Sequence, residues 1–101
     1  MTEVEQMQAA AAYTLLGCTV HTWSRQVAIM SGAGVIPTAH SVNPFLNDGD
    51  AFRLAVEAGV FTRASWPDAL AKALQRAPDD APDAVTRRMI VHFVVTFGRH
   101  L

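Results

Sequence analysis

The sequence predicts an α+β fold in which a small antiparallel sheet packs against three or four helices. Several segments place apolar residues at three- and four-residue steps between polar caps, as amphipathic helices do. A run rich in β-branched and aromatic residues at 18–30 interrupts this pattern, as strands do. The length of 101 residues suits one domain spanning 1–101.

The first helix is expected over 2–17, TEVEQMQAAAAYTLLG. Thr2 and Glu5 have the spacing of a capping box, in which each side chain bonds an orphan amide at the helix start. Gly17 is a suitable residue to end the helix. Apolar residues recur at three- and four-residue steps and form one stripe: Val4, Met7, Ala11, Thr14 or Leu15, and Cys18.

A hairpin is expected next, with strands at Thr19–Trp23 and 26–30 joined by a turn at Ser24 and Arg25. The following stretch, VIPTAHSVNP at 35–44, is expected to be extended. Pro37 and Pro44 cause this, because each disfavours helix at the residue before it.

Turn residues and acidic residues then gather at 43–50, NPFLNDGD. Asn47 can cap a helix start while Asp50 reaches back, and Asp48 also lies in the first turn. The positive end of the helix dipole stabilises each carboxylate there by ~0.3–1 kcal/mol. Gly59 closes the helix. Apolar residues cover most of its circumference, which predicts a short, nearly buried helix: Ala51, Phe52, Leu54, Ala55, Val56 and Ala58.

The segment 60–62 is expected to form a short strand. A further helix is expected to end at about Arg76. Ser65 and Asp68 have capping-box spacing at its start, and Pro67 lies in the first turn, where its missing N–H costs little.

The last helix is expected within 81–98, with Asp79 or Asp80 as its cap and Gly98 as its stop. The composition of 90–97 is also compatible with a buried strand. The cap and stop signals favour the helix, which is apolar on two flanks.

Composition limits the classes of partner. Half of the residues are apolar, and a domain of this size has a large surface for its volume, so we expect a homodimer or larger homo-oligomer. The formal net charge of −1 argues against a general nucleic-acid binder. Cys18 is the single cysteine, which makes a reducing cytoplasm the default location. No apolar run is long enough to span a membrane, so no membrane association is expected.

No metal or cofactor is expected. If Gly49 were the sixth residue of an EF-hand loop, the twelfth would be Ala55, where that loop needs a bidentate Glu. Only Cys18 could supply a thiolate, and no two histidines have a helical ligand spacing. Nucleophilic catalysis has no better support, and no catalytic residue is assigned.

Two charged clusters form the candidate binding site. Asp48 and Asp50 lie at one helix start, and Arg87 and Arg88 lie near another with only Asp83 within one turn. A carboxylate–guanidinium contact would neutralise both clusters. We therefore expect Arg87 or Arg88 to reach Asp48 or Asp50, within one chain or across a dimer.

The last helix also carries a cationic stripe of Arg88, His92 and Arg99. Such a stripe can bind an anion, such as a phosphate, or an acidic partner surface. The alternative is a solvated face, which is the usual role of charges on a helix.

Two segments resemble a group of small phage and prophage proteins with no assigned activity. Their pattern is roughly Asn-Pro-Leu-x-Asp-Asp-Gly-Asp-Ala-x-Arg-Leu-Ala-Val, then Ala-x-Thr-Arg-Arg-x-Ile-Val near the C-terminus. Val42 stands where those proteins often have an aromatic residue, and they tend to be strand-like where DALAKALQRAP at 68–78 is helical in pattern. The matching residues are Asn43, Pro44, Asp48, Gly49, Asp50, Ala51, Arg53, Leu54, Ala55 and Val56, then Ala84, Thr86, Arg87, Arg88, Ile90 and Val91.

The resemblance implies a phage-encoded cytoplasmic accessory protein that binds and modulates a host component, with a defence system as one candidate. A small nucleotide- or anion-binding protein using Arg88, His92 and the Asp48/Asp50 turn is the alternative. A small enzyme of unknown reaction comes third, and the resemblance transfers no catalytic residue.

Overall fold

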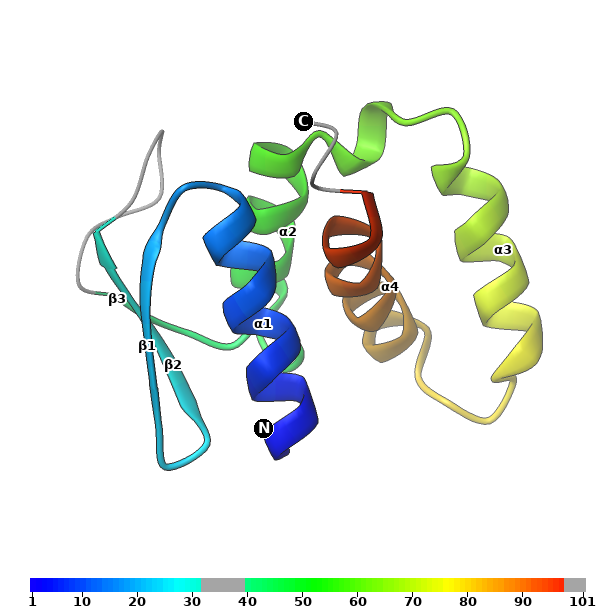
Figure 1. Ribbon diagram of the computed structural model, residues 1–101. Coiled ribbons are helices and arrows are strands. Elements are labelled where there is room, and N and C mark those ends of the chain that lie inside the picture. The colour runs from blue at the N-terminus through cyan, green and yellow to red at the C-terminus, as the bar shows by residue number, and fades with distance from the viewer. Residues whose placement is uncertain (32–39, 98–101) are drawn as a thin grey trace.

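The computed structural model describes residues 1–31 and 40–97, and it confirms the α+β class. Figure 1 shows the sheet at one side of the molecule and α3 at the other, with α4 between them. In chain order the described elements are α1 (Glu3–Leu15), β1 (Thr19–Trp23), β2 (Gln26–Ser31), β3 (His40–Val42), α2 (Asp48–Ala58), the 3₁₀ helix η1 (Val60–Thr62), α3 (Trp66–Arg76) and α4 (Pro82–Phe97).

The predicted hairpin is confirmed. β1 and β2 pair antiparallel, with Trp23 opposite Gln26, and a two-residue turn joins them. Ser24 and Arg25 have φ of 45° and 64°, the left-handed values that such a tight turn requires. β3 pairs antiparallel with the other side of β2, so the sheet order is β1-β2-β3. Pro37 lies outside the described residues.

The capping box of α1 is confirmed, but its apolar stripe does not face the core. The Thr2 amide donates to Glu5 Oε1 at 3.0 Å, and the Glu5 amide donates to Thr2 Oγ1 at 3.2 Å. Met7 is 67 % exposed, whereas the buried residues are Ala9, Ala12 and Tyr13. Small alanines let the α1 backbone approach the sheet and α4 closely, which the pattern of larger apolar residues does not reveal.

The ends of α2 agree with the sequence, but its packing does not. The Asn47 side chain accepts from the Asp50 amide at 2.9 Å, and Gly59 ends the helix at φ 69°. Asp50 does not return the bond to Asn47; its carboxylate accepts from the Asn43 amide at 2.9 Å. The prediction of a nearly buried helix is wrong, because the side of α2 that carries Phe52 and Val56 is exposed.

The segment 60–62 is the helical turn η1 and not a strand. The left-handed Gly59 leads directly into i→i+3 hydrogen bonds, in which the Thr62 amide donates to the Gly59 carbonyl. α3 ends at Arg76 as predicted. Ser65, however, makes no capping hydrogen bond through its side chain, because its backbone is already helical.

The last segment is a helix, as its cap and stop signals favour. α4 begins at Pro82. The residue before it is Ala81, so the prediction of Asp79 or Asp80 as the cap is wrong, and the Asp80 carboxylate accepts from Arg88 Nη2 at 2.7 Å instead. Gly98 lies outside the described residues.

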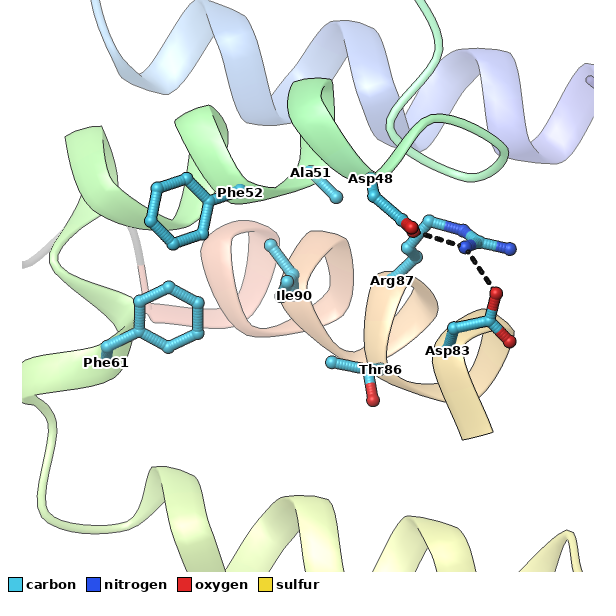
Figure 2. Close-up of a pocket in the computed structure, with 8 residues that line it drawn as sticks. All are labelled: Asp48, Ala51, Phe52, Phe61, Asp83, Thr86, Arg87 and Ile90. Atoms are coloured by element: carbon cyan, nitrogen blue, oxygen red, sulfur yellow. Dashed lines mark hydrogen bonds and ion pairs between the residues drawn. The ribbon is translucent and has the colours of Figure 1, made fainter. Parts of the chain in front are cut away.

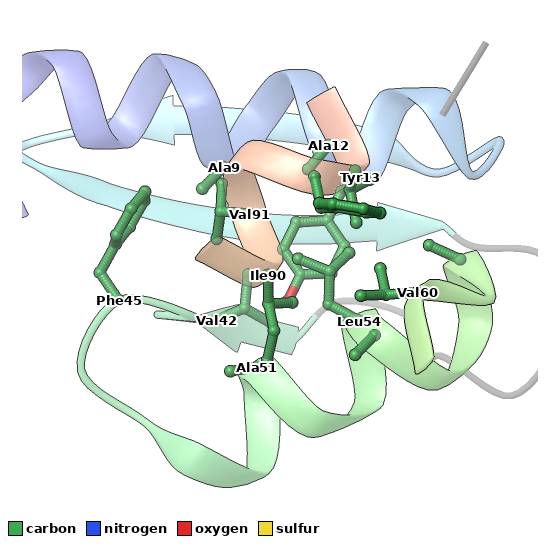
Figure 3. Packing of buried hydrophobic residues seen from close by; sticks show 14 of the residues in the cluster. Ala9, Ala12, Tyr13, Val42, Phe45, Ala51, Leu54, Val60, Ile90 and Val91 are labelled. Atoms are coloured by element: carbon green, nitrogen blue, oxygen red, sulfur yellow. The ribbon is translucent and has the colours of Figure 1, made fainter. Parts of the chain in front are cut away.

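α4 is the centre of the packing, with contacts to α1, α2, η1 and α3. Figure 3 shows how side chains from α1, the sheet, α2 and α4 meet in one core. The largest fully buried side chains are Tyr13, Ile29, Leu54, Val27, Val60, Val91, Val94 and Pro44. This core holds the start of α2 against the first turns of α4, where the candidate site lies.

Candidate functional site

Arg87 joins the start of α2 to α4. Its Nη1 lies 2.5 Å from Asp48 Oδ1 and 3.1 Å from Asp83 Oδ2. Its Nε donates to the carbonyl of Phe45 at 2.9 Å. Figure 2 shows the guanidinium between the two carboxylates. The predicted contact between the clusters is therefore confirmed, within one chain and through Arg87 and Asp48.

Local turn chemistry places Asp48 opposite α4. Pro44 is fully buried, and the Asn43 side chain accepts from the Leu46 amide at 3.2 Å. The Asn43 carbonyl accepts from the Asn47 amide at 2.8 Å, which closes the turn just before α2. Asp83 lies one helical turn before Arg87 on α4 and reaches the guanidinium from the same helix. The turn before α2 brings Asp48 to the same guanidinium.

The cluster has one more negative charge than positive. Arg87 donates a hydrogen bond to the Asp83 carboxylate, and this lowers the pKa of Asp83 below its usual range. The bond to Asp48 is the main cause that raises the pKa of Arg87. Asp48 and Asp83 are 77 % and 62 % exposed, whereas the Arg87 side chain is only 12 % exposed. The carboxylates therefore face solvent, and the cation lies beneath them.

Beside this cluster lies a cleft of about 350 Å³ between α2, η1 and α4. Figure 2 shows Phe52 and Phe61 at one end of the cleft and the charged cluster at the other, with Ile90 between them. The two phenyl rings lie 5.8 Å apart and are 61 % and 43 % exposed. The lining residues are Asp48, Ala51, Phe52, Phe61, Asp83, Thr86, Arg87 and Ile90.

A row of aromatic rings connects the cleft to the interior. Phe61 contacts Trp66 at 5.9 Å, Trp66 contacts Phe93 at 5.4 Å, and Phe93 contacts Phe97 at 4.7 Å between centroids. Trp66 and Phe93 are buried, so Phe61 rests on a packed support. Aromatic pairs at these separations stabilise one another, which holds the exposed end of the row in place.

The sequence pattern does not single out Phe52 or Phe61, because it predicts a buried helix at the first and a strand at the second. The one local signal near Phe61 is Gly59, the helix-ending glycine two residues before it. That glycine does not distinguish a buried from an exposed neighbour, since Val60, directly after it, is buried while Phe61 is 43 % exposed.

The other predicted site residues lie elsewhere. Asp50 bonds Asn43 and does not line the cleft. Arg88 pairs with Asp80, and His92 is exposed beside the groove between α3 and α4. Arg99 lies outside the described residues. The structure thus brings Asp48 and Arg87 together, and it does not place Arg88 or His92 in the cleft.

Across residues 1–31 and 40–97, no three His, Cys, Asp or Glu side chains gather in a way that could hold a metal ion. Among the same residues, no helix has both the length and the apolar character needed to cross a membrane.

No protein-family model, curated protein or solved structure matches this chain.

Proposed function

We propose that this chain is a phage-encoded accessory protein of the host cytoplasm that binds a host protein through the α2–η1–α4 cleft. A component of a host defence system is one candidate partner. The observation that carries the proposal is the composition of the cleft. Both segments that resemble phage proteins line it, the first through Asp48 and Ala51 and the second through Thr86, Arg87 and Ile90.

The cleft has the chemistry of a protein-binding site. Exposed aromatic side chains supply rigid apolar contact area, and buried interface centres are enriched in such residues. Its volume of about 350 Å³ suits one or two side chains of a partner. The two carboxylates that share Arg87 leave an excess of negative charge at one end. The best partner segment therefore presents an apolar anchor with a lysine or arginine beside it.

The anion-binding alternative has less support in the geometry. The guanidinium groups of Arg87 and Arg88 each bind a carboxylate of the same chain. An anion at either group would have to compete with that carboxylate, and the exposed Asp48 and Asp83 would repel it. The accessory-protein proposal therefore remains first.

The proposal is tested by capture from host lysate with variants of the immobilised protein. Phe52→Ser and Phe61→Ser remove the apolar wall of the cleft. Val56→Ser is the matched control, because Val56 is 54 % exposed on the same helix but does not line the cleft. We expect each Phe variant to weaken capture of a specific protein by roughly tenfold or more, as truncation of an interface anchor does, and the control to retain it.

Capture that survives both Phe substitutions would contradict the proposal, as would equal loss in the Val56 control. Native mass spectrometry of the gently purified protein supplies a second readout. A co-purifying small anion, with no protein captured, would favour the alternative function. Circular dichroism and thermal unfolding confirm that each variant is folded.

A further inference from the structure

Within residues 1–31 and 40–97, β1 is an edge strand, and its own side chains give little protection against pairing on its outer side. In the described part of the chain its one strand neighbour is β2, and four of its five residues are exposed. Its sequence is TVHTW, with no lysine, acidic residue or proline. Natural sheets usually block exposed edges with charges, prolines or cover from another segment. An edge of β-branched and aromatic residues is instead suited to pairing with a further strand.

The alternation of backbone hydrogen bonds fixes which groups point outward. The two-residue turn makes Trp23 and Gln26 the closing hydrogen-bonded pair of the hairpin. Alternation then directs the amide and carbonyl groups of His21 toward β2, and those of Val20 and Thr22 away from it. Four backbone groups, spaced two residues apart, are thus presented at the free edge.

From this edge we infer that the protein forms a homodimer in which β1 of each copy pairs antiparallel across a two-fold axis at His21. In this register Val20 of one copy lies opposite Thr22 of the other, and all four outward groups of each copy find partners. A second copy of this chain meets all four outward groups, and the exposed apolar residues of its α1 match those of the first copy, so we take the partner to be a second copy. The two three-stranded sheets become one six-stranded sheet.

The exposed side of α1 supplies the remaining area. A five-residue strand spans only about 17 Å, and a stable interface buries a total of ~1,200–2,000 Å². α1 packs on β1 and β2, so the two copies of α1 lie on the same face of the joined sheet, either side of the axis. The residues that this side of α1 exposes are Val4, Met7 and Leu15, at 63 %, 67 % and 40 %. Thr14 lies beside them, with its hydroxyl already bonded to the Ala10 carbonyl at 2.8 Å.

The register has a specific consequence at His21. The two His21 side chains lie directly opposite each other in a non-hydrogen-bonded pair, with Cα atoms about 4.5 Å apart. Like charges at this position oppose pairing, and opposite charges favour it. Since His21 is exposed, charged substitutions there leave the core of each copy unchanged.

Light scattering coupled to size exclusion, at tens of micromolar and neutral pH, tests the inference. The unchanged protein should have the mass of a dimer. His21→Glu and His21→Lys should each raise the dissociation constant at least about tenfold and elute as monomers. An equimolar mixture of the two variants should restore the dimer mass, which loss of folding in either variant cannot imitate.

Ser41→Glu on the other edge strand, β3, is the matched control and should remain dimeric. A monomeric unchanged protein would overturn the inference, and so would His21 variants that each stay dimeric. Restoration that fails on mixing two folded, monomeric variants would also overturn it, because the two side chains would then not face each other. None of these results depends on the cleft, which shares no residue with β1 or α1.

Discussion

Replacing Arg87 with alanine should cost far more stability than its surface ion pairs would suggest. The side chain is 12 % exposed, and its Nε donates to the Phe45 carbonyl in the turn before α2. A hydrogen bond from a charged donor contributes about 1.5–3 kcal/mol. The pair with Asp48 involves an exposed carboxylate, and such a pair contributes only about 0–1 kcal/mol. The sum for Arg87→Ala is about 2–4 kcal/mol.

Urea unfolding followed by tryptophan fluorescence measures this loss. Trp66 is buried beside α4 and reports the packing of that region, while Trp23 is 46 % exposed. In a domain of about 100 residues, a loss of 1 kcal/mol lowers the Tm by roughly 4–8 °C. Arg87→Ala should therefore lower the Tm by more than about 8 °C.

Asp48→Asn is the comparison that separates the two contributions. It weakens the ion pair and leaves the bond to Phe45 intact, so it should cost no more than about 1 kcal/mol. If Arg87→Ala costs no more than Asp48→Asn, the hydrogen bond from Arg87 Nε to the Phe45 carbonyl adds no stability, and the reasoning is refuted.

Three further predictions concern the ends of α2 and the core. Asp50→Ala should lower the free energy of unfolding in urea by about 0.5–2 kcal/mol, because it removes the acceptor for the Asn43 amide. Asp50→Asn keeps an acceptor and should cost less, so equal losses in the two variants would contradict the prediction. Gly59→Ala should lower the free energy of unfolding by about 1–2 kcal/mol, because residue 59 has the left-handed φ of 69°. Gly59→Asn should cost less, since Asn tolerates that conformation, and equal Tm values for the two variants would contradict the argument from backbone strain. Burial raises the pKa of Tyr13, so the folded state keeps the phenol neutral while the unfolded state ionises it from about pH 10. The free energy of unfolding should therefore fall above that pH by up to about 1.4 kcal/mol per pH unit. Tyr13→Phe should lose this fall, and parallel plots of stability against pH for the two proteins would refute the prediction.

Sequence patterns were most accurate where the cause of a structure is local. The capping box of Thr2 and Glu5, the cap at Asn47 and the stop at Gly59 were all predicted, because each depends on residues within one or two turns. The hairpin was predicted for the same reason, since two short β-rich runs with a two-residue connection leave little choice of register. The pairing of Arg87 with Asp48 is an exception among long-range contacts. Charge balance predicted it, because each cluster lacked a sufficient partner nearby.

Predictions failed where burial depends on which element arrives from elsewhere in the chain. The larger apolar residues of α1 suggested one face, yet the alanine-rich side with Tyr13 is the one that meets the sheet and α4. Phe52 has the composition of a core residue, yet no element covers it within the described residues, and it forms a wall of the cleft. At 60–62 the left-handed glycine before it directs the chain into a helical turn.

Caps, glycines and periodicity act over a few residues, so local patterns were enough to locate the four α-helices and the hairpin of the described residues along the chain. Which face of each helix is buried, and which residues line the cleft, depend on how the elements pack together. Amphipathic patterns state that a helix has an apolar side, but the packing of α4 against α1, α2 and α3 selects the apolar residues that are covered. That selection leaves Phe52 and Phe61 partly exposed, and the candidate site exists because of it.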